Sequence, residues 1–537
     1  MRAKIAAAGV FLALATAYPA LAAPGDLDPG FGEFGRIVHR DLVDHELTDA
    51  TLLPDGRVVA VGHDHGERYG GLRPVALAVT PAGAIDPSFG DQGKTVLDPS
   101  RGYQDTASAA AVAVQPDGRI VLAGAYRTVG GYRLFAARLD PSGEPDPSFG
   151  EGGIATYPVP AAVYRDAVEV ALAPGDRIVI ASDDRLVRLN PDGDLDPSFA
   201  GDGELVTPLA GGQYYFGTGL GVMPDGRIVV GGGDQRSPAA ARAAIARYLP
   251  DGSPDSGWGD SGVVRGLSLG KGRAVNELVV DSSGGVTGVV VNSQGQSSVL
   301  VRLTTAGKLD RSYSRDGVTR AVSARLSSLL FEDGRALAAG SDGREFVLAR
   351  YRPDGKVDRT FSRDGKLRTN LGGNGDAAVA VLRLASGAIL AVGNQGNSAS
   401  RYSLVYPAFA RYLDGGRRHD ADADGRVDRR DRCPNVSAVG HRGCPYFEGS
   451  VTLRESPNGE SLSVWLNYPS HGCERAGPVK LMRAVPGRDE LVMKRRRTFP
   501  NFPVPDQPGR YYARVPRRIV GGVGICEGAR SYAIKVG

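Results

Sequence analysis

The chain repeats one short phrase seven times, and this repetition constrains its fold more than any other feature. The clearest copies read Asp-Pro-Ser-Phe-Gly, at 86–90 and at 146–150, and each is followed three residues later by a glycine. A period of this size is typical of repeat architectures. The steps between the anchoring aromatics are 58, 60, 50, 59, 55 and 48 residues, and these aromatics are Phe31, Phe89, Phe149, Phe199, Trp258, Tyr313 and Phe361.

Each copy contains four short apolar segments separated by turn residues. In the second copy they cover 110–114, 119–124, 132–139 and a stretch that starts near Ile154. The Pro-Asp-Gly at 116–118 is a turn sequence, because Pro presets φ and Gly accepts positive φ. Four antiparallel strands per repeat are typical of a propeller blade. We predict an all-β chain with a seven-bladed β-propeller over 24–414, in which the phrase aromatics pack between blades and the phrase aspartates cap tight turns.

The order of segments also predicts how the ring closes. The first copy begins with the phrase and a strand near 36–38, whereas the last copy ends with a three-strand set at 377–384, 388–392 and 404–413. We expect the N-terminal strand to complete the last blade, because this pairing removes a sheet edge that would otherwise be open.

Residues 25–414 resemble the bacterial delta-60 repeat family, which carries the same G-x-x-D-x-S-F-G-x-x-G phrase and P-D-G-R turn. The resemblance implies a secreted propeller and says little about chemistry. The fifth to seventh copies depart from the pattern: all three lack the Pro, and Ser314 and Ser362 replace the Gly after the aromatic in the last two.

The N-terminus reads as a secretory signal peptide over 1–23. Arg2 and Lys4 are basic, 5–17 is apolar, and Ala20-Leu21-Ala22 is a small-x-small cleavage signal. The apolar run is short for a membrane span, although an uncleaved anchor is the alternative. We therefore expect an extracellular or cell-envelope protein with no transmembrane span after cleavage.

An acidic segment within 415–445 has the ligand spacing of a twelve-residue calcium loop. Gly425 lies at position 6, and Arg426 at position 7 would offer its backbone carbonyl. Ca²⁺ prefers six to eight oxygen ligands, and this spacing supplies them. A solvated acidic linker is the alternative reading. The carboxylates at positions 1, 3, 5, 9 and 12 belong to Asp420, Asp422, Asp424, Asp428 and Asp431.

This segment is similar to thrombospondin type 3-like repeats rather than to helical EF-hands. Position 12 is Asp, no amphipathic helices flank the loop, and Cys-Pro-Asn at 433–435 and Gly-Cys-Pro at 443–445 follow it. The resemblance implies a disulfide between Cys433 and Cys444. All four cysteines lie in the last quarter of the chain, and an even number in a secreted protein favours two disulfides.

Residues 446–537 predict an immunoglobulin-like β-sandwich, because polar and apolar residues alternate in 461–466, 479–483 and 511–515. The stretch 509–515 resembles a late strand of bacterial surface modules of this type, and we assign Cys473 and Cys526 to its disulfide. The module holds 15 Lys and Arg against 8 Asp and Glu. Its basic run at 494–497 is either an attachment site for an anionic surface polymer or a solvated hairpin tip. Nucleic acid is not expected as a partner, because no aromatic stripe accompanies the run.

No catalytic signature is present in the sequence, so we assign no catalytic residue and leave enzymatic activity open. His63 and His65 can ligate a metal or be ordinary loop residues. Carboxylates of different blades can meet in the central channel. The leading function is a secreted binding or adhesion platform for a glycan or protein, with the ligand on loops 63–73, 125–131 and 233–241. The alternatives are a propeller hydrolase or lyase acting on polysaccharide, which requires carboxylates of perturbed pKa at the channel, and a purely structural envelope protein.

Overall fold

The computed structural model describes most of 24–414 and separate strands beyond it. Residues 1–23 and 415–445 lie outside the described part, and the predictions of a signal peptide and a calcium loop fall on them. Every regular element in the described part is a β-strand. The ranges described up to 414 are 24–65, 71–100, 106–128, 131–159, 167–182, 184–209, 219–234, 239–362, 364–397 and 404–414.

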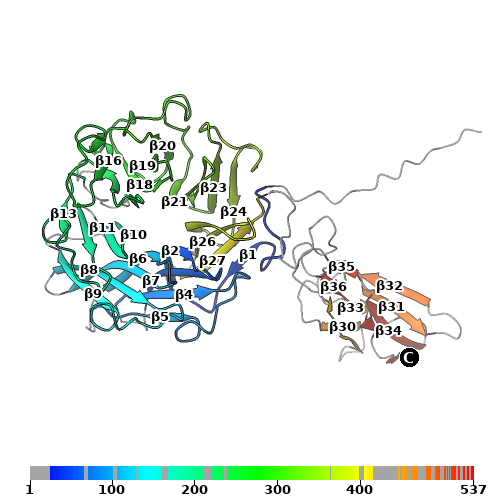
Figure 1. Ribbon diagram of the computed structural model, residues 1–537. Helices are drawn as coiled ribbons and strands as arrows, with labels where there is room; N and C mark the ends of the chain where they lie inside the picture. The colour runs from blue at the N-terminus through cyan, green and yellow to red at the C-terminus, as the bar shows by residue number, and fades with distance from the viewer. Residues whose placement is uncertain are drawn as a thin grey trace, which may run out of the picture.

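The described strands up to residue 414 form seven sheets, the same number as the copies of the phrase. Each sheet is an antiparallel meander, and Figure 1 shows the sheets arranged as a ring with the first strand of each nearest the centre. The all-β propeller predicted from the repeats is therefore confirmed. The first sheet holds β2 (His45–Leu52), β3 (Val58–Asp64), β4 (Arg73–Val79) and β5 (Lys94–Val96); the second holds β6 (Thr106–Val114), β7 (Ile120–Thr128), β8 (Gly131–Leu139) and β9 (Ile154–Val159).

The remaining sheets repeat this order, except that the fifth has three strands. The third sheet holds β10 (Val168–Ala173), β11 (Arg177–Ser182), β12 (Arg185–Leu189) and β13 (Glu204–Val206); the fourth holds β14 (Gly219–Val222), β15 (Ile228–Gly233), β16 (Ala243–Tyr248) and β17 (Val263–Arg265). The fifth holds β18 (Arg273–Val280), β19 (Val286–Asn292) and β20 (Ser298–Leu303); the sixth holds β21 (Arg325–Glu332), β22 (Arg335–Ser341), β23 (Phe346–Tyr351) and β24 (Lys366–Thr369); the seventh holds β25 (Ala377–Arg383), β26 (Ile389–Asn397) and β27 (Leu404–Tyr412).

The ring is closed by the N-terminal strand, as the order of segments predicts. Strand β1 (Arg36–Val38) pairs antiparallel with β27, with Ile37 opposite Phe409, and becomes the fourth strand of the seventh sheet. In Figure 1 the blue β1 lies beside the yellow β27. The innermost strands complete the circle, because each of β2, β6, β10, β14, β18, β21 and β25 contacts the next and β25 contacts β2. Closure joins residues at least 370 positions apart and leaves the edge of β27 paired.

The core of the propeller consists of apolar clusters between neighbouring sheets. One cluster joins Val59 and Val61 of the first sheet to Ala109 and Leu122 of the second. Small residues on the inner strands let neighbouring sheets approach closely near the axis, and dense packing of this kind stabilises repeat proteins through their interfaces. One sheet by itself could not bury both of its faces.

The meander topology gives the ring two different faces. We call the end that carries the connections from second to third strands the loop face. The C-terminal ends of β3, β7 and β15, from which loops 63–73, 125–131 and 233–241 start, lie on it. We call the opposite end the turn face; it carries the Pro-Asp-Gly turns and the repeated phrases. The strand ends that flank the loops proposed to hold a ligand thus lie on one side of the molecule.

Beyond residue 445 the structure describes strands in three sheets. Leu462, Leu481, Phe502 and Tyr511 are buried in them. An immunoglobulin-like sandwich stays a prediction. No helix in the described part of the whole chain is both long and apolar enough to cross a membrane. The strands are β28 (Tyr446–Phe447), β29 (Ser450–Glu455), β30 (Ser461–Asn467), β31 (Val479–Ala484), β32 (Glu490–Arg495), β33 (Asn501–Pro503), β34 (Gly509–Val515), β35 (Arg518–Val520), β36 (Gly524–Cys526), β37 (Ala529–Arg530) and β38 (Ile534–Val536).

Candidate functional site

The repeated phrase builds joints between sheets. Every phrase aromatic is at most 1% exposed. Phe149, for example, lies in a cluster with Val121 of the second sheet and Ile180 of the third. Each of the seven aromatics lies in a different cluster that joins two neighbouring sheets: Phe31, Phe89, Phe149, Phe199, Trp258, Tyr313 and Phe361.

The phrase aspartate organises the turn and holds an arginine. Asp146 accepts hydrogen bonds from the backbone N–H of Ser148 at 2.9 Å and from its hydroxyl at 2.7 Å. The other carboxylate oxygen accepts from Arg138 Nε at 2.8 Å. An aspartate–arginine pair of this kind is present at every copy: Asp28–Arg411, Asp86–Arg57, Asp146–Arg138, Asp196–Arg188, Asp255–Arg247, Asp310–Arg302 and Asp358–Arg350.

These arginines also reach the neighbouring sheet. Arg138 donates to the carbonyl oxygen of Pro191, and Arg247 donates to that of Thr305 at 3.1 Å. The arginines were not predicted from the sequence, although a signal was present: an arginine stands eight residues before the phrase aspartate in the copies with Arg138, Arg188 and Arg247, among others. The first sheet has Ala78 at that position, and Arg57 from the preceding turn supplies the charge instead. The phrase is therefore a structural joint, because its aromatic side chain packs between sheets and its aspartate pairs with an arginine.

Three carboxylates lie near the axis of the ring, one from every other sheet. Asp49 pairs with Val61, Glu169 with Ala181 and Glu277 with Val289, so they occupy the same position on the innermost strands β2, β10 and β18. The equivalent positions of the other sheets hold small residues: Ala111, Gly219, Ser328 and Ala380. We call Asp49, Glu169 and Glu277 the axial carboxylates.

Burial raises the pKa of all three axial carboxyl groups. Desolvation by the surrounding strands raises the pKa of Asp49 to about 7, against hydrogen bonds to its carboxylate from Val112 N and Ala50 N. Desolvation and then the charge of Asp49 raise the pKa of Glu277 to about 8. The pKa of Glu169 is raised by desolvation and by the charges of Glu277 and Asp49. The pKa values of all three carboxyl groups are therefore raised, and shifts of this kind are common at functional sites.

A cationic cleft lies between the fifth and sixth sheets, near the turn face. Its volume is about 810 Å³, and five of its lining residues are cationic whereas two are anionic. The cleft exists because 314–322, the segment after Tyr313, makes only isolated bridges to β20 and forms no fourth strand. Arg315 stands there with a φ of 73°, a left-handed conformation that side chains other than Gly adopt at a cost. The charged lining residues are Arg315, Arg320, Arg352, Lys356, Arg359, Asp316 and Asp358.

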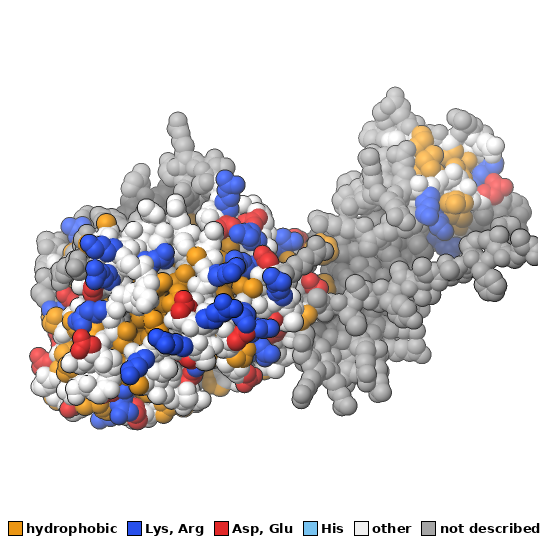
Figure 2. All heavy atoms as spheres, turned by 90° about the horizontal axis from the view of Figure 1, so that it is seen from above, with side chains coloured by type: hydrophobic (Ala, Val, Ile, Leu, Met, Phe, Trp, Pro, Cys, Tyr) orange, Lys and Arg blue, Asp and Glu red, His pale blue; other side chains and the backbone are white. Residues whose placement is uncertain are grey.

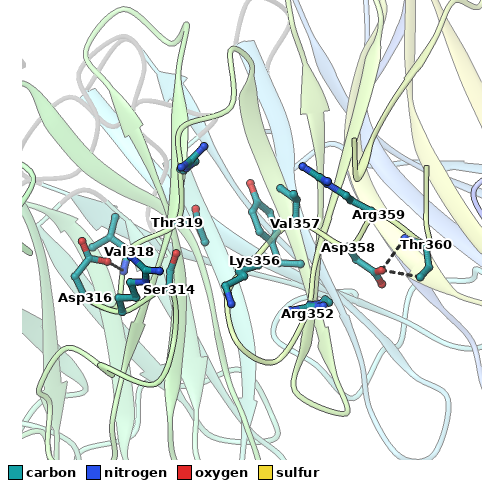
Figure 3. A pocket seen from close by; sticks show the side chains of 14 residues that line it. Ser314, Asp316, Val318, Thr319, Arg352, Lys356, Val357, Asp358, Arg359 and Thr360 are labelled. Atoms are coloured by element: carbon teal, nitrogen blue, oxygen red, sulfur yellow. Dashed lines mark hydrogen bonds between the residues drawn. The ribbon is translucent and has the colours of Figure 1, made fainter. Parts of the chain in front are cut away.

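Figure 3 shows the two walls of the cleft, with Ser314 to Thr319 on one side and Lys356 to Thr360 on the other. The Asp358 carboxylate already has partners within the protein: it accepts a hydrogen bond from the Thr360 hydroxyl at 2.6 Å and pairs with Arg350 at 2.9 Å. Val318 and Val357 give the cleft an apolar part. The side of the ring seen in Figure 2 carries many Lys and Arg side chains around patches of hydrophobic surface.

The predicted calcium ligands and three of the cysteines lie outside the described residues. Asp420, Asp422, Asp424, Arg426, Asp428 and Asp431 fall there, as do Cys433, Cys444 and Cys473. The backbone of Cys526 lies in β36. His63 and His65 are described, and both lie at the loop face.

Comparison with known proteins supports a family of propeller repeats. The family described as "Domain of unknown function (DUF5122) beta-propeller" matches residues 115–149, 176–199, 224–257 and 332–361. Each of these segments runs from near a strand turn to a phrase. A comparison with curated proteins found no match.

Several solved structures match this chain at low identity. The α-L-arabinofuranosidase Arb93A from Fusarium graminearum is 10% identical, with 70% of this chain and 94% of that chain covered and a TM-score of 0.34. A polysaccharide lyase of family PL25, an ulvan lyase, is 10% identical, with 61% and 79% covered and a TM-score of 0.33. A quinonprotein alcohol dehydrogenase-like protein from Bacteroides thetaiotaomicron is 12% identical, with a TM-score of 0.28; the match covers 49% of this chain and about half (54%) of that protein.

Proposed function

We propose that this protein binds an anionic polysaccharide outside the cell, and that the cationic cleft between the fifth and sixth sheets is the binding site. The support is the cleft itself: about 810 Å³ of space with five cationic and two anionic residues around it. A polysaccharide chain with carboxylate or sulfate groups matches this lining, because it offers negative charges at intervals along sugar rings that have apolar C–H faces. Concentrated positive charge beside low-dielectric walls raises the local concentration of such a ligand.

The cationic side chains of the cleft differ in how available their charges are to a ligand. Arg352 and Lys356 both pair with Asp354 across the turn, at 2.5 and 3.2 Å. Arg315, Arg320 and Arg359 are exposed. We therefore assign the main ligand contacts to these three arginines.

Dextran sulfate, with uncharged dextran as control, tests this proposal. We expect the full chain to bind dextran sulfate but not dextran, and its affinity for dextran sulfate to fall as the salt concentration rises. Replacing Arg315, Arg320 and Arg359 together by Gln is expected to weaken binding at least tenfold. Matched exposed charges outside the cleft, Arg344→Gln and Lys271→Gln, are expected to leave it unchanged. Equal binding by the triple cleft variant would falsify the assignment, and loss of binding in Lys494→Gln/Arg495→Gln alone would move the site to the C-terminal module.

A second candidate function is hydrolysis or elimination of a polysaccharide at the axial carboxylates. The raised pKa of these groups favours it, because a general acid works best when its pKa lies near the operating pH. A protonated and an ionised carboxyl group in one site are the two partners that glycoside cleavage requires. On this proposal Glu169 or Glu277 supplies the proton and Asp49, with two backbone N–H donors on its carboxylate, stays ionised.

An assay of released reducing ends and of unsaturated products on a panel of anionic polysaccharides tests the second candidate. Glu169→Gln and Glu277→Gln keep the shape of the side chains and are expected to reduce the rate more than a hundredfold. Asp117→Asn, an exposed carboxyl group on the turn face, serves as the control. Product release that is equal in wild type and both Gln variants would exclude the axial carboxylates.

We also propose that the segment 415–445 binds Ca²⁺ and that the chain is exported after cleavage near residue 23. The support is the spacing of the acidic residues and the character of the N-terminal segment. Affinity is expected in the range of extracellular modules, roughly 10⁻⁴–10⁻³ M. Calorimetry of the full chain should show heat with millimolar Ca²⁺ that disappears in Asp422→Asn/Asp424→Asn. N-terminal sequencing of the secreted protein locates the cleavage.

A further inference from the structure

Two imidazoles and a carboxylate converge at the loop face of the first sheet. Glu46 on β2 and His63 on β3 lie opposite each other in register, and His65 follows β3 directly. One potential ligand atom from each residue lies within 4.8 Å of the other two. His63 Nε2 is 3.6 Å from Glu46 Oε2, and the rings of His63 and His65 are 5.3 Å apart between centroids.

His63 is held in place by the neighbouring sheet. Its Nδ1 lies 3.0 Å from the hydroxyl oxygen of Ser108 on β6, and both side chains are buried. The Ser108 hydroxyl donates to the carbonyl oxygen of Ala109 at 3.1 Å. A hydroxyl has one proton, so Ser108 then accepts from Nδ1–H, and this hydrogen-bond network assigns the lone pair to Nε2.

The assigned tautomer aims a lone pair at a carboxylate. Nε2 of His63 and Oε2 of Glu46 both offer electron pairs across 3.6 Å, and a cation between them converts repulsion into attraction. A metal-bound histidine usually gives its other ring N–H to an oxygen, as His63 does to Ser108. From this geometry we propose that Glu46, His63 and His65 bind a divalent transition metal of the Zn²⁺ type, with Ser108 as a positioning residue.

The spacing and the donor types fit such an ion. Ligands about 2.0–2.2 Å from a tetrahedral Zn²⁺ are about 3.3–3.6 Å apart, and the His63–Glu46 separation already has this value. His65 is exposed, and one of its ring nitrogens lies within 4.8 Å of the other two ligand atoms. Imidazole nitrogen favours Zn²⁺ over Ca²⁺, and three protein ligands leave a fourth position open to water or to a ligand group. Arg73, a cation at the start of β4, pairs with Asp64 at 3.1 Å.

Metal binding to the full chain, after chelator treatment and in millimolar Ca²⁺ to saturate any calcium site, tests the proposal. Equilibrium dialysis with Zn²⁺ should give one site that is lost, or weakened at least tenfold, in His65→Ala and in Glu46→Gln. Both variants change side chains with solvent access, and Asp41→Asn, an exposed carboxyl group beside His39, is the matched control. Co²⁺ bound in place of Zn²⁺ should give a visible absorption band in wild type and Asp41→Asn that is absent from His65→Ala.

The role of Ser108 has a separate readout. Ser108→Ala removes no ligand and should weaken Zn²⁺ binding about 10–100-fold, as loss of a hydrogen bond to a ligating histidine does. Thermal unfolding identifies variants that fail to fold. Unchanged Zn²⁺ stoichiometry, affinity and Co²⁺ spectrum in both His65→Ala and Glu46→Gln overturn the proposal. Neither result depends on the cationic cleft, which lies near the other face of the ring.

Discussion

Arg138 lies over the ring of Phe149, with its guanidinium carbon 4.8 Å from the ring centroid. The same guanidinium pairs with Asp146 and donates to the carbonyl oxygen of Pro191 in the next sheet. One arginine thus connects the phrase aromatic, the phrase aspartate and the neighbouring sheet. Cation–π pairs of this geometry are present at Phe31, Phe149, Phe199, Trp258 and Phe361. In the fifth sheet the arginine, Arg302, lies over Phe331 instead of the phrase residue Tyr313.

The first prediction concerns the aromatic of this joint. Phe149→Ala is expected to destabilise the propeller by about 3–5 kcal/mol, because it removes a fully buried ring and leaves a cavity between two sheets. Phe34→Ala is the control, since Phe34 is 68% exposed. Urea unfolding followed by fluorescence measures both. A Phe149→Ala transition at the wild-type midpoint would show that the aromatic is not a packing residue.

The second prediction concerns the buried ion pair. Asp146→Asn is expected to destabilise the propeller by about 3–5 kcal/mol, because the buried Arg138 loses its carboxylate partner. Arg138→Met should cost less, because Arg119 Nε still lies 3.2 Å from Asp146. The double variant should lose less unfolding free energy than the two single variants lose together. Arg368→Gln breaks an exposed pair with Asp342 and should change stability by less than about 1 kcal/mol. Strict additivity in a double-mutant cycle would contradict the coupling.

The third prediction is that stability falls as pH rises from about 5 to about 8. The axial carboxyl groups have folded-state pKa values above their unfolded values, about 7 for Asp49 and about 8 for Glu277. The folded state then holds more protons than the unfolded state over this window, so stability decreases with pH. Asp49→Asn/Glu277→Gln should flatten the decrease. Melting temperatures measured from pH 5 to pH 9 in both proteins provide the check.

The phrase aspartates have the opposite effect at acidic pH. Burial raises the pKa of Asp146, but hydrogen bonds from Ser148 and Arg138 outweigh it and hold the pKa below its usual range. Such groups contribute stability above their unfolded pKa, and this stability is lost as pH falls through the folded value. Stability should therefore be highest between the two regimes, near pH 4–5. A maximum above pH 8 would contradict the raised pKa values of the axial carboxyl groups. Stability that does not fall at acidic pH would contradict the lowered pKa of Asp146.

The fourth prediction concerns the residue that follows the phrase aromatic. Ala200 has a φ of 54° where other copies hold Gly90 and Gly150 at φ of 50° and 53°. Ala200→Gly is expected to stabilise the propeller by about 0.5–1 kcal/mol, because it relieves a left-handed conformation. The reverse change, Gly150→Ala, should destabilise, since its Cβ would lie 2.4 Å from the carbonyl oxygen of Ile154. Equal stabilities in thermal unfolding would argue against strain at this position.

The fifth prediction tests ring closure. A chain that begins at residue 41 lacks Phe31 and β1, and should melt earlier and associate more than one that begins at residue 24. The physical reason is that β27 becomes an open edge and the cluster around Phe31 and Phe409 loses its centre. Calorimetry and light scattering on the two chains measure these effects. Identical melting of the two chains would show that β1 is dispensable.

Much of the propeller could be predicted from the sequence because its signals are local. Turn residues, alternating segments and a regular period all act over a few residues, and they indicated four strands per repeat, the phrase aromatics as packing residues and the closing role of the segment near Ile37. The arginine eight residues before the phrase aspartate was a readable signal that repeats with the same period, as at Arg138 and Arg188. It indicates contact only once β8 and the phrase are placed in one sheet.

The two groups with the most chemistry were decided by tertiary structure. Asp49, Glu169 and Glu277 stand more than 100 residues apart, and only a closed ring brings their innermost strands around one axis, where shared burial raises their pKa. Glu46 joins His63 and His65 because antiparallel pairing of β2 and β3 sets them opposite each other. By itself the sequence determined the repeating unit, since local turn and strand preferences suffice for it. Ring closure and strand register determine which side chains of different units meet, because both depend on packing summed over the whole ring.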